Sequence, residues 1–173
     1  MSEINWKPDF SKWYNVNKDS YKFIFEQAEK RLEDILSESE SITNKSIKMA
    51  TAVVAMFAFF IGFLIQKSIP LGYNSIFIGL FIINVSAIVY LIFPKEVKLR
   101  GLTPKILIPS NLDADEDKDV QAEMLYYSAI RLLQDNIDFM LDKNSFRAKV
   151  YLASLIMCLF LFVVGTISIT LSL

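Results

Sequence analysis

The sequence contains no histidine and only one cysteine, Cys158. Histidine is the commonest general base, neutral metal ligand and pH switch of proteins, so its absence removes the usual owner of all three roles. A single cysteine excludes an intrachain disulfide, and a thiol within an apolar stretch is usually a packing residue. Glycine-rich phosphate loops and Ser/His/Asp arrangements are also missing from the sequence. We therefore expect a protein that is not an enzyme, with no catalytic residue, no metal site and no cofactor.

Charge is missing from three long stretches, residues 49–66, 73–93 and 150–173. Each holds about 18 to 24 residues, and at ~1.5 Å of rise per helical residue this length matches a hydrocarbon core of ~30 Å. The hydrophobic content of 53% and the mean hydropathy of +0.37 are too high for an ordinary soluble domain. The sequence therefore predicts an all-α integral membrane protein whose first partner is the lipid bilayer, with three transmembrane helices and a long-helix cytoplasmic stalk.

The positive charges outside these stretches predict the topology. Lysine and arginine gather before residue 49 and again between 94 and 149, whereas the loop between the first two spans holds only Lys67. The positive-inside rule then puts the N-terminus in the cytoplasm and the C-terminus outside, in a multi-pass protein of the cell inner membrane. The polar N-terminal stretch lacks an early apolar region, so we expect a retained signal anchor. A net charge of −1 gives no reason to expect a nucleic-acid partner.

The expected organisation follows from the spans and the charges. Proline and glycine disfavour a helix directly after the second span, so an extended strap is expected there. The five parts are a cytoplasmic N-terminal helical region (1–48), a transmembrane hairpin (49–93), an extended cytoplasmic connector (94–118), a cytoplasmic amphipathic helix (119–149) and the third transmembrane helix (150–173). Because both cytoplasmic helices lead into the membrane, we expect them to lie parallel to each other.

A first seam of apolar and small side chains precedes the first span, in a helix that Asn17 can cap. Its 4,3 spacing is that of a heptad repeat, with charged residues on the other faces. Two interpretations are open: the helix packs on its neighbour in the same subunit, or the seam pairs subunits. The members of this first seam are Tyr21, Phe25, Ala28, Leu32, Ile35, Ser39, Ile42, Ser46 and Met49.

A second seam with the same spacing begins in the region 119–149 and continues into the third span. Its bulky members, which precede the span, are Tyr126, Ile130, Leu133, Ile137 and Met140. The register then passes through Asn144, Arg147 and Tyr151 to the small residues Ser154, Cys158, Gly165 and Ser168. Bulk drives association in water, whereas small residues permit close approach in lipid. These bulky and small members are our candidates for an oligomer seam or a pore.

The helix that carries the second seam should begin near the acidic run 113–119. That run fails as a calcium loop, since Lys118 stands where glycine is needed and Met124 where a bidentate glutamate is needed. Acidic residues before a helix are instead favoured by capping and by the helix dipole. One helix could continue from here through the membrane, or the pair 144–145 could break it.

Polar and small residues within the first two spans allow two interpretations. Asn84 lies near the middle of the second span and is a further pore candidate, with Ser75, Gly79, Ser86 and Tyr90 on a neighbouring face. A small-residue stripe on the first span consists of Thr51, Ala55, Ala58 and Gly62. Such stripes most often mediate helix packing, and the alternative is the polar lining of a channel. The charge-free spans disfavour an ion-coupled transporter.

Two stretches carry a resemblance in layout: SESESITNKSIKMATAVVAMF, which enters the first span, and RLLQDNIDFMLDKNSFRAKVYLASLI, which enters the third. The chain resembles small bacterial membrane effectors of anti-phage and nucleotide-conflict systems, nearest to the two-span SLATT family. It is also similar to membrane accessory proteins of RNA-targeting CRISPR loci, some of which oligomerise as pores. Some of those have an Arg–His nuclease-like motif, which cannot carry over to a chain without histidine.

The resemblance implies a homo-oligomeric membrane effector that permeabilises or depolarises the bacterial inner membrane in anti-phage defence. A cytoplasmic protein or a nucleotide signal would be its trigger. A second reading of the same residues is a membrane anchor or immunity-type protein. Its cytoplasmic helices would then dock a soluble partner through the part of the second seam between residues 126 and 140.

Overall fold

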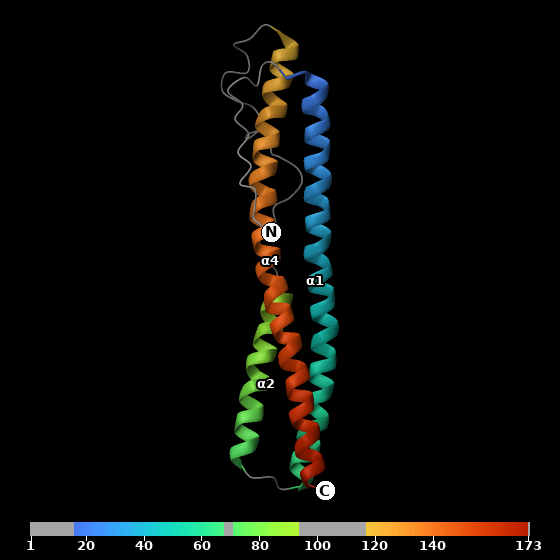
Figure 1. Ribbon diagram of the computed structural model, residues 1–173, viewed down its shortest axis with the longest axis vertical. Coiled ribbons are helices and arrows are strands. Elements are labelled where there is room, and N and C mark those ends of the chain that lie inside the picture. The colour runs from blue at the N-terminus through green and yellow to red at the C-terminus, as the bar shows by residue number, and fades with distance from the viewer. Residues whose placement is uncertain (1–15, 68–70, 94–116, 173) are drawn as a thin grey trace. The chain divides into compact units, whose positions relative to one another are not determined.

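The structure, a computed structural model, describes residues 16–67, 71–93 and 117–172. Within these ranges it consists of helices without any strand: α1 (Lys18–Lys67), α2 (Leu71–Ile92) and α4 (Lys118–Ser172) (Figure 1). This confirms the all-α fold. All three helices are long and apolar enough to cross a membrane, as the sequence predicted. The extended connector expected after the second span falls almost wholly on 94–116, outside the described residues.

Side chains cap the N-termini of both long helices. The side-chain oxygen of Asn17 accepts a hydrogen bond from the backbone N–H of Asp19 at 3.1 Å, and Asp117 does the same for Asp119 at 2.9 Å. The first N–H groups of a helix have no partner within it, so such a cap stabilises the helix by about 1 kcal/mol. The predicted Asn17 cap is confirmed, and α4 begins at the end of the acidic run.

Helix α4 runs without interruption for 55 residues. Of the two open interpretations, the continuous helix is therefore the one observed, and the pair 144–145 does not break it. Asparagine and serine cost a helix only about 0.5 kcal/mol each relative to alanine, whereas a proline, which α4 lacks, would cost about 3 kcal/mol. Helix α1 is likewise continuous over 50 residues and passes through Gly62.

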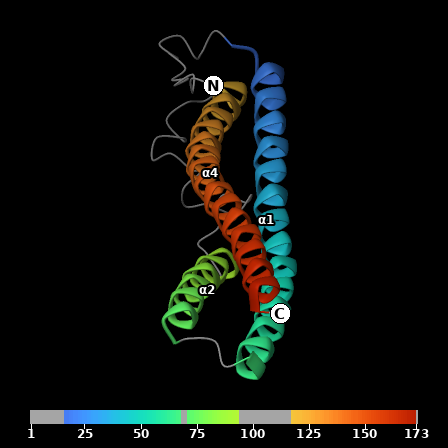
Figure 2. The ribbon, with the colours of Figure 1, turned by 60° about the horizontal axis from the view of Figure 1, so that its bottom comes forward.

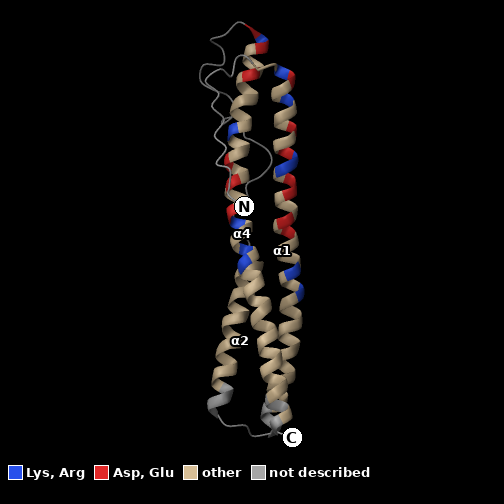
Figure 3. Cartoon of the chain, viewed as in Figure 1, with Lys and Arg blue, Asp and Glu red and all other residues tan. Residues whose placement is uncertain are grey.

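The chain divides into two compact units, and α1 and α4 each contribute to both. The charged unit comprises Met1–Ile35 and Val97–Met140, and the apolar unit comprises Leu36–Glu96 and Leu141–Leu173. Figure 3 shows acidic and basic residues along the described helices of the charged unit; in the described part of the apolar unit they lie on the first portions of its α1 and α4 segments. The boundaries between the units fall before residues 49 and 150, where the first and third spans are expected to begin. The apolar unit therefore also contains the polar contacts of Ser39, Thr43 and Arg147.

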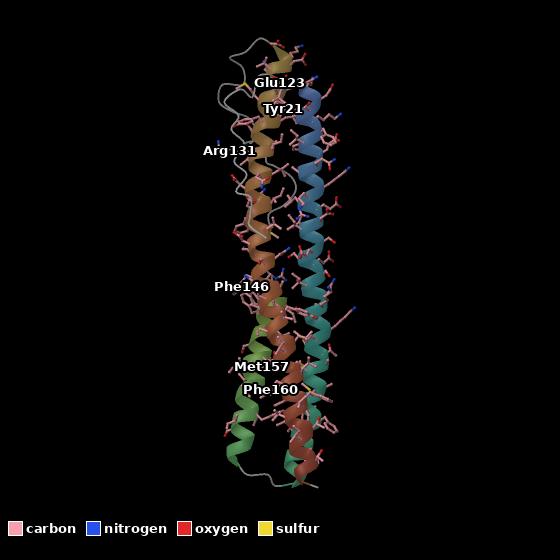
Figure 4. The ribbon with its side chains drawn as sticks, viewed as in Figure 1. Tyr21, Glu123, Arg131, Phe146, Met157 and Phe160 are labelled. Carbon is pink, nitrogen blue, oxygen red and sulfur yellow. The ribbon has the colours of Figure 1, made fainter. Side chains whose placement is uncertain are left out.

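In the charged unit α1 and α4 lie side by side and run in the same direction (Figures 1 and 2). Lys18 pairs with Asp119 at 2.9 Å, and the rings of Phe25 and Tyr126 have centroids 5.7 Å apart. Both pairs are separated by 101 positions along the chain, as expected for parallel helices in register. The predicted parallel arrangement is thus observed. Figure 4 shows Tyr21 in the space between the two helices and Arg131 directed away from α1.

In the apolar unit the inner faces of all three helices pack together. Val53, Phe81 and Ile88 form a buried cluster, and the Phe57 and Phe81 rings stack with centroids 3.6 Å apart. The outer faces are apolar as well, and Ile76, for example, is 68% exposed. Contiguous apolar surface of this kind is unfavourable in water and natural in lipid. The packing therefore agrees with a multi-pass membrane protein.

Candidate functional site

Arg147 is a buried cation of the apolar unit, next to the C-terminal end of α2. Its side chain is only 6% exposed, which is rare for an arginine. It extends from α4 and reaches both other helices of the unit. We call Arg147 with its partners Ser39, Thr43 and Leu91 the arginine cluster.

Hydrogen bonds use both terminal nitrogens of Arg147. Nη1 donates to the backbone oxygen of Ser39 at 3.3 Å and to the Ser39 hydroxyl. Nη2 donates to the Thr43 hydroxyl at 2.7 Å and to the backbone oxygen of Leu91 at 3.1 Å. The Thr43 hydroxyl in turn donates to the Ser39 backbone oxygen at 3.1 Å, which ties the two α1 positions to each other. The cluster thus joins all three helices through one planar side chain.

The bond to Leu91 satisfies a group that α2 cannot satisfy itself. Leu91 lies in the last turn of α2, where carbonyl groups have no intrahelical partner and carry the negative end of the helix dipole. A cation at this end is favoured by both effects. The guanidinium therefore closes α2 from outside.

Among the described residues, the charge of Arg147 meets only neutral oxygens. No described carboxylate pairs with it, and its Nε is buried without a hydrogen-bond partner among the described residues. Burial lowers the pKa of the Arg147 guanidinium, although arginine remains protonated at any physiological pH. Removing the neutral acceptors from a buried cation costs free energy, because the charge is then left without hydrogen bonds. The cluster therefore persists only while the three helices stay together.

A second polar contact lies within the predicted spans. The Ser154 hydroxyl of α4 donates a hydrogen bond to the side-chain oxygen of Asn84 on α2. Asn84 is 1% exposed and Ser154 is 3% exposed. The Asn84 Nδ2 amide group has no partner in the described part of the chain. The predicted spans therefore contain a buried polar pair, and the Asn84 amide donor has no described partner.

Gly165, another small member of the second seam, makes room for an aromatic ring. It is buried, and a Cβ at this position would overlap the ring of Phe60 on α1. The Phe60 ring also meets Phe77 of α2 edge-on, with centroids 5.5 Å apart. The small residue thus allows an aromatic contact between α1 and α4 rather than close approach of two backbones.

Most of the other described members of the second seam are buried within the single chain. Ile130, Leu133, Ile137 and Met140 are all buried within the charged unit, and Leu133 is fully covered. Tyr126 and Cys158 are half-buried, and the side chain of Ser168 is outside the described set. The first seam is covered in the same way, which is the packing within one subunit that the sequence allowed. A subunit contact through either seam stays a prediction, and it would need these helices to separate.

The small-residue stripe of α1 differs from the two seams because its residues are exposed. Thr51, Ala55, Ala58 and Gly62 are all exposed, and nothing lies within 4 Å of a Cβ placed at Gly62. The Thr51 hydroxyl donates to the Ile47 carbonyl at 3.3 Å, so the stripe presents no unsatisfied polar group. Its surface is compatible with either lipid or another small-residue helix face.

In the described part of the charged unit, the pKa values of Lys18 and Tyr21 are shifted. The hydrogen bond from Lys18 to Asp119 raises the pKa of this exposed lysine, and the attraction between the two charges adds to it. Burial raises the pKa of the Tyr21 phenol, with a further contribution from the negative charge of Glu123. Among the described residues no group of acidic side chains or thiols could hold a metal ion.

The sequence had placed Arg147 in the second seam without giving it a role. The sequence did contain a signal for this role, namely a charged residue at a seam position. Such a side chain must either find polar partners within the packed face or turn out of that face. Its partners could not be found from spacing alone, because two of the four acceptors are backbone oxygens. No protein-family model, no curated protein and no solved structure matches the chain. The geometry therefore defines a class only: an all-α protein with three helices able to cross a membrane.

Proposed function

We propose that this chain is a homo-oligomeric effector that permeabilises or depolarises the bacterial inner membrane, in anti-phage defence. Its N-terminus would be cytoplasmic and its C-terminus outside. The charged unit would receive a protein or nucleotide signal, and the spans would form the conducting path. The helix packing of the present structure would then be that of the closed state.

The continuity of α1 and α4 is the observation that carries this proposal. Each is a single helix that belongs to both units, with 50 and 55 residues respectively. A ligand that changes the pairing of α1 and α4 in the charged unit therefore acts on the same two helices that form much of the apolar unit. Helices that rotate or shift as rigid elements are a common way to convert such a signal into a change at a distance.

The polar pair of Asn84 and Ser154 supports a path through the spans. Polar side chains within a membrane segment are costly unless they have partners or meet water, and they are typical of conduction pathways. In the described state the pair is covered, and Asn84 keeps an amide donor without a described partner. Rearrangement of α2 against α4 would turn this pair towards water.

The exposed stripe of small residues on α1 supports assembly. The open space at Gly62 would allow a second helix to approach closely. Small residues at 4,3 spacing permit this kind of approach between helices in lipid, where apolar bulk alone gives no driving force.

The test is a measurement of membrane potential together with subunit number. Cells that express the full chain are followed with a voltage-sensitive dye, and the purified protein is weighed in detergent by mass photometry. We expect depolarisation and an oligomer. The Asn84→Leu variant should alter the depolarisation, whereas Ser86→Ala should not, because the exposed Ser86 hydroxyl only bonds the Ile82 carbonyl of its own helix. An unchanged potential together with a monomer would contradict the proposal.

The second candidate is a membrane anchor or immunity-type protein that docks a soluble partner. It is favoured by the packing of both seams within one chain, where the described seam side chains are buried or half-buried. Purification from membranes separates the two candidates. A stoichiometric soluble partner bound to a monomer supports the anchor, whereas a ring of identical chains supports the effector.

A further inference from the structure

In the apolar unit, positively charged residues lie on α1 and α4 directly before the uncharged stretches of these two helices. Beyond Glu40 the remaining charged residues of α1 are lysines, and beyond Asp142 those of α4 are lysine or arginine. Lys45 and Lys48 on α1 and Lys149 on α4 are exposed. We call these three lysines the basic belt. Figure 3 shows the basic residues of both helices next to the uncharged parts.

The arginine cluster aligns the three helices and so places the belt within about two helical turns along them. Arg147 contacts Thr43 and Leu91, so these positions of α4, α1 and α2 lie side by side. Lys45 follows Thr43 by two residues, and Lys149 follows Arg147 by two. Lys45 and Lys149 thus lie close to the depth of the C-terminal end of α2, and Lys48 lies three residues, or about one helical turn, further along α1.

Aromatic side chains mark the same level independently. The rings of Tyr90 on α2 and Phe146 on α4 meet edge-on with centroids 6.0 Å apart, and the two residues are exposed at 42% and 55% respectively. Each is the chain neighbour of a member of the arginine cluster, Leu91 and Arg147 respectively. Exposed aromatic residues at the ends of membrane helices typically lie among lipid headgroups. The aromatic pair and the basic belt therefore coincide at the expected headgroup depth.

The cations at this level differ in availability. Arg147 spends four N–H donors on neutral oxygens of the chain. The belt lysines are exposed, and none of them pairs with a carboxylate among the residues that the structure describes. An ammonium group is a compact point charge that binds phosphate without the fixed geometry of a guanidinium. The lysines are therefore free to meet an external anion, whereas Arg147 is not.

We propose that the basic belt binds the phosphate groups of anionic phospholipids in the adjoining leaflet, with the Tyr90–Phe146 pair beside them. A lysine near an anionic surface strengthens attachment by roughly fivefold, so three should give a preference of at least about tenfold after screening by salt. The lipid would thereby favour the aligned arrangement of the three helices. This inference does not depend on whether the protein conducts ions.

The test uses the full chain in a neutral detergent, titrated with phosphatidylglycerol or phosphatidylcholine. Lipid retention is measured by native mass spectrometry and followed by the shift in melting temperature. We expect at least a tenfold preference for phosphatidylglycerol in the wild type. The triple variant Lys45→Gln, Lys48→Gln, Lys149→Gln should reduce it to about twofold or less. The matched control replaces three exposed cations of the charged unit, by Lys22→Gln, Lys30→Gln and Arg131→Gln, and should keep the full preference.

Salt and inorganic phosphate supply further arms. Raising NaCl from 0.1 to 0.5 M should weaken the wild-type preference, which keeps the proposal testable if the triple variant fails to fold. Inorganic phosphate at 10 mM should not displace the lipid. Displacement by phosphate would instead indicate a free-phosphate site and overturn the proposal. An unchanged preference in the belt variant, an equal loss in the control variant, or no effect of salt would each overturn it too.

Discussion

Arg147 of α4 donates a hydrogen bond to the backbone oxygen of Leu91 at 3.1 Å, and so a side chain from one helix closes the C-terminal end of another. The same guanidinium holds Ser39 and Thr43 of α1. The three helices of the apolar unit are thus joined at one level by a group that no described carboxylate neutralises. The stability of this junction rests on hydrogen-bond geometry rather than on a salt bridge.

Replacing Arg147 should therefore destabilise the apolar unit. Arg147→Lys keeps the charge but cannot reach four acceptors with a planar fork, and we expect a loss of about 2–4 kcal/mol in the free energy of unfolding. Thermal unfolding in detergent, followed by circular dichroism, measures the loss. Arg131→Lys, on the same helix but exposed, is the matched control and should change stability by less than about 0.5 kcal/mol. Equal melting temperatures for the two variants would refute a role for the fork geometry.

Gly165 should be intolerant of any side chain. A methyl group there overlaps the Phe60 ring, so Gly165→Ala is expected to cost about 1–3 kcal/mol through overpacking. Gly79→Ala provides the comparison, since nothing lies within 4 Å of the added Cβ. That change should stabilise the helix slightly, by up to about 1 kcal/mol. Melting temperatures in the same detergent decide the matter, and a neutral Gly165→Ala would mean that the ring moves away freely.

Asn84 and Ser154 should be energetically coupled. Ser154→Ala leaves the buried Asn84 oxygen without its donor and should cost about 1 kcal/mol. Once Asn84 is replaced by leucine, removing the Ser154 hydroxyl should cost much less, because no acceptor is then left unsatisfied. A double-mutant cycle on unfolding free energies measures the coupling. Additive losses would show that the two side chains do not depend on each other, with Ser86→Ala as the neutral reference.

The charged unit should lose stability in alkali through Tyr21. Burial raises the pKa of this phenol above its ordinary value of about 10, so folding favours the protonated form. The resulting stabilisation is fully present below pH ~10 and is lost as the pH rises through the higher value of the folded state. Phenolate absorbance near 295 nm, recorded with helicity, should show a late, cooperative ionisation. In Tyr21→Phe this component should vanish, and its persistence would assign it to another tyrosine.

Several elements could be predicted from the sequence because they depend on composition and local chemistry. The three apolar stretches, the Asn17 cap and the parallel direction of α1 and α4 follow from hydropathy, a side-chain oxygen next to free N–H groups, and topology. The choice between a continuous and a broken α4 could not be predicted. Asn144 and Ser145 disfavour a helix only slightly, and whether packing offsets this cost depends on the tertiary structure. The interior position of both seams was likewise one of two possibilities at equal spacing.

That three helices could cross a membrane follows from the amino-acid sequence, since uncharged stretches of this length fit a bilayer whatever their neighbours are. Tertiary structure alone decided which polar groups meet: Arg147 with Leu91, and Asn84 with Ser154. Those contacts depend on how each of the three helices is rotated about its axis and shifted along it relative to the next. Heptad spacing alone does not determine either quantity. The tertiary structure also leaves the small-residue stripe of α1 exposed and places the Phe60 ring against Gly165. Spacing indicates that a face will pack, and only the neighbouring side chains indicate what packs on it.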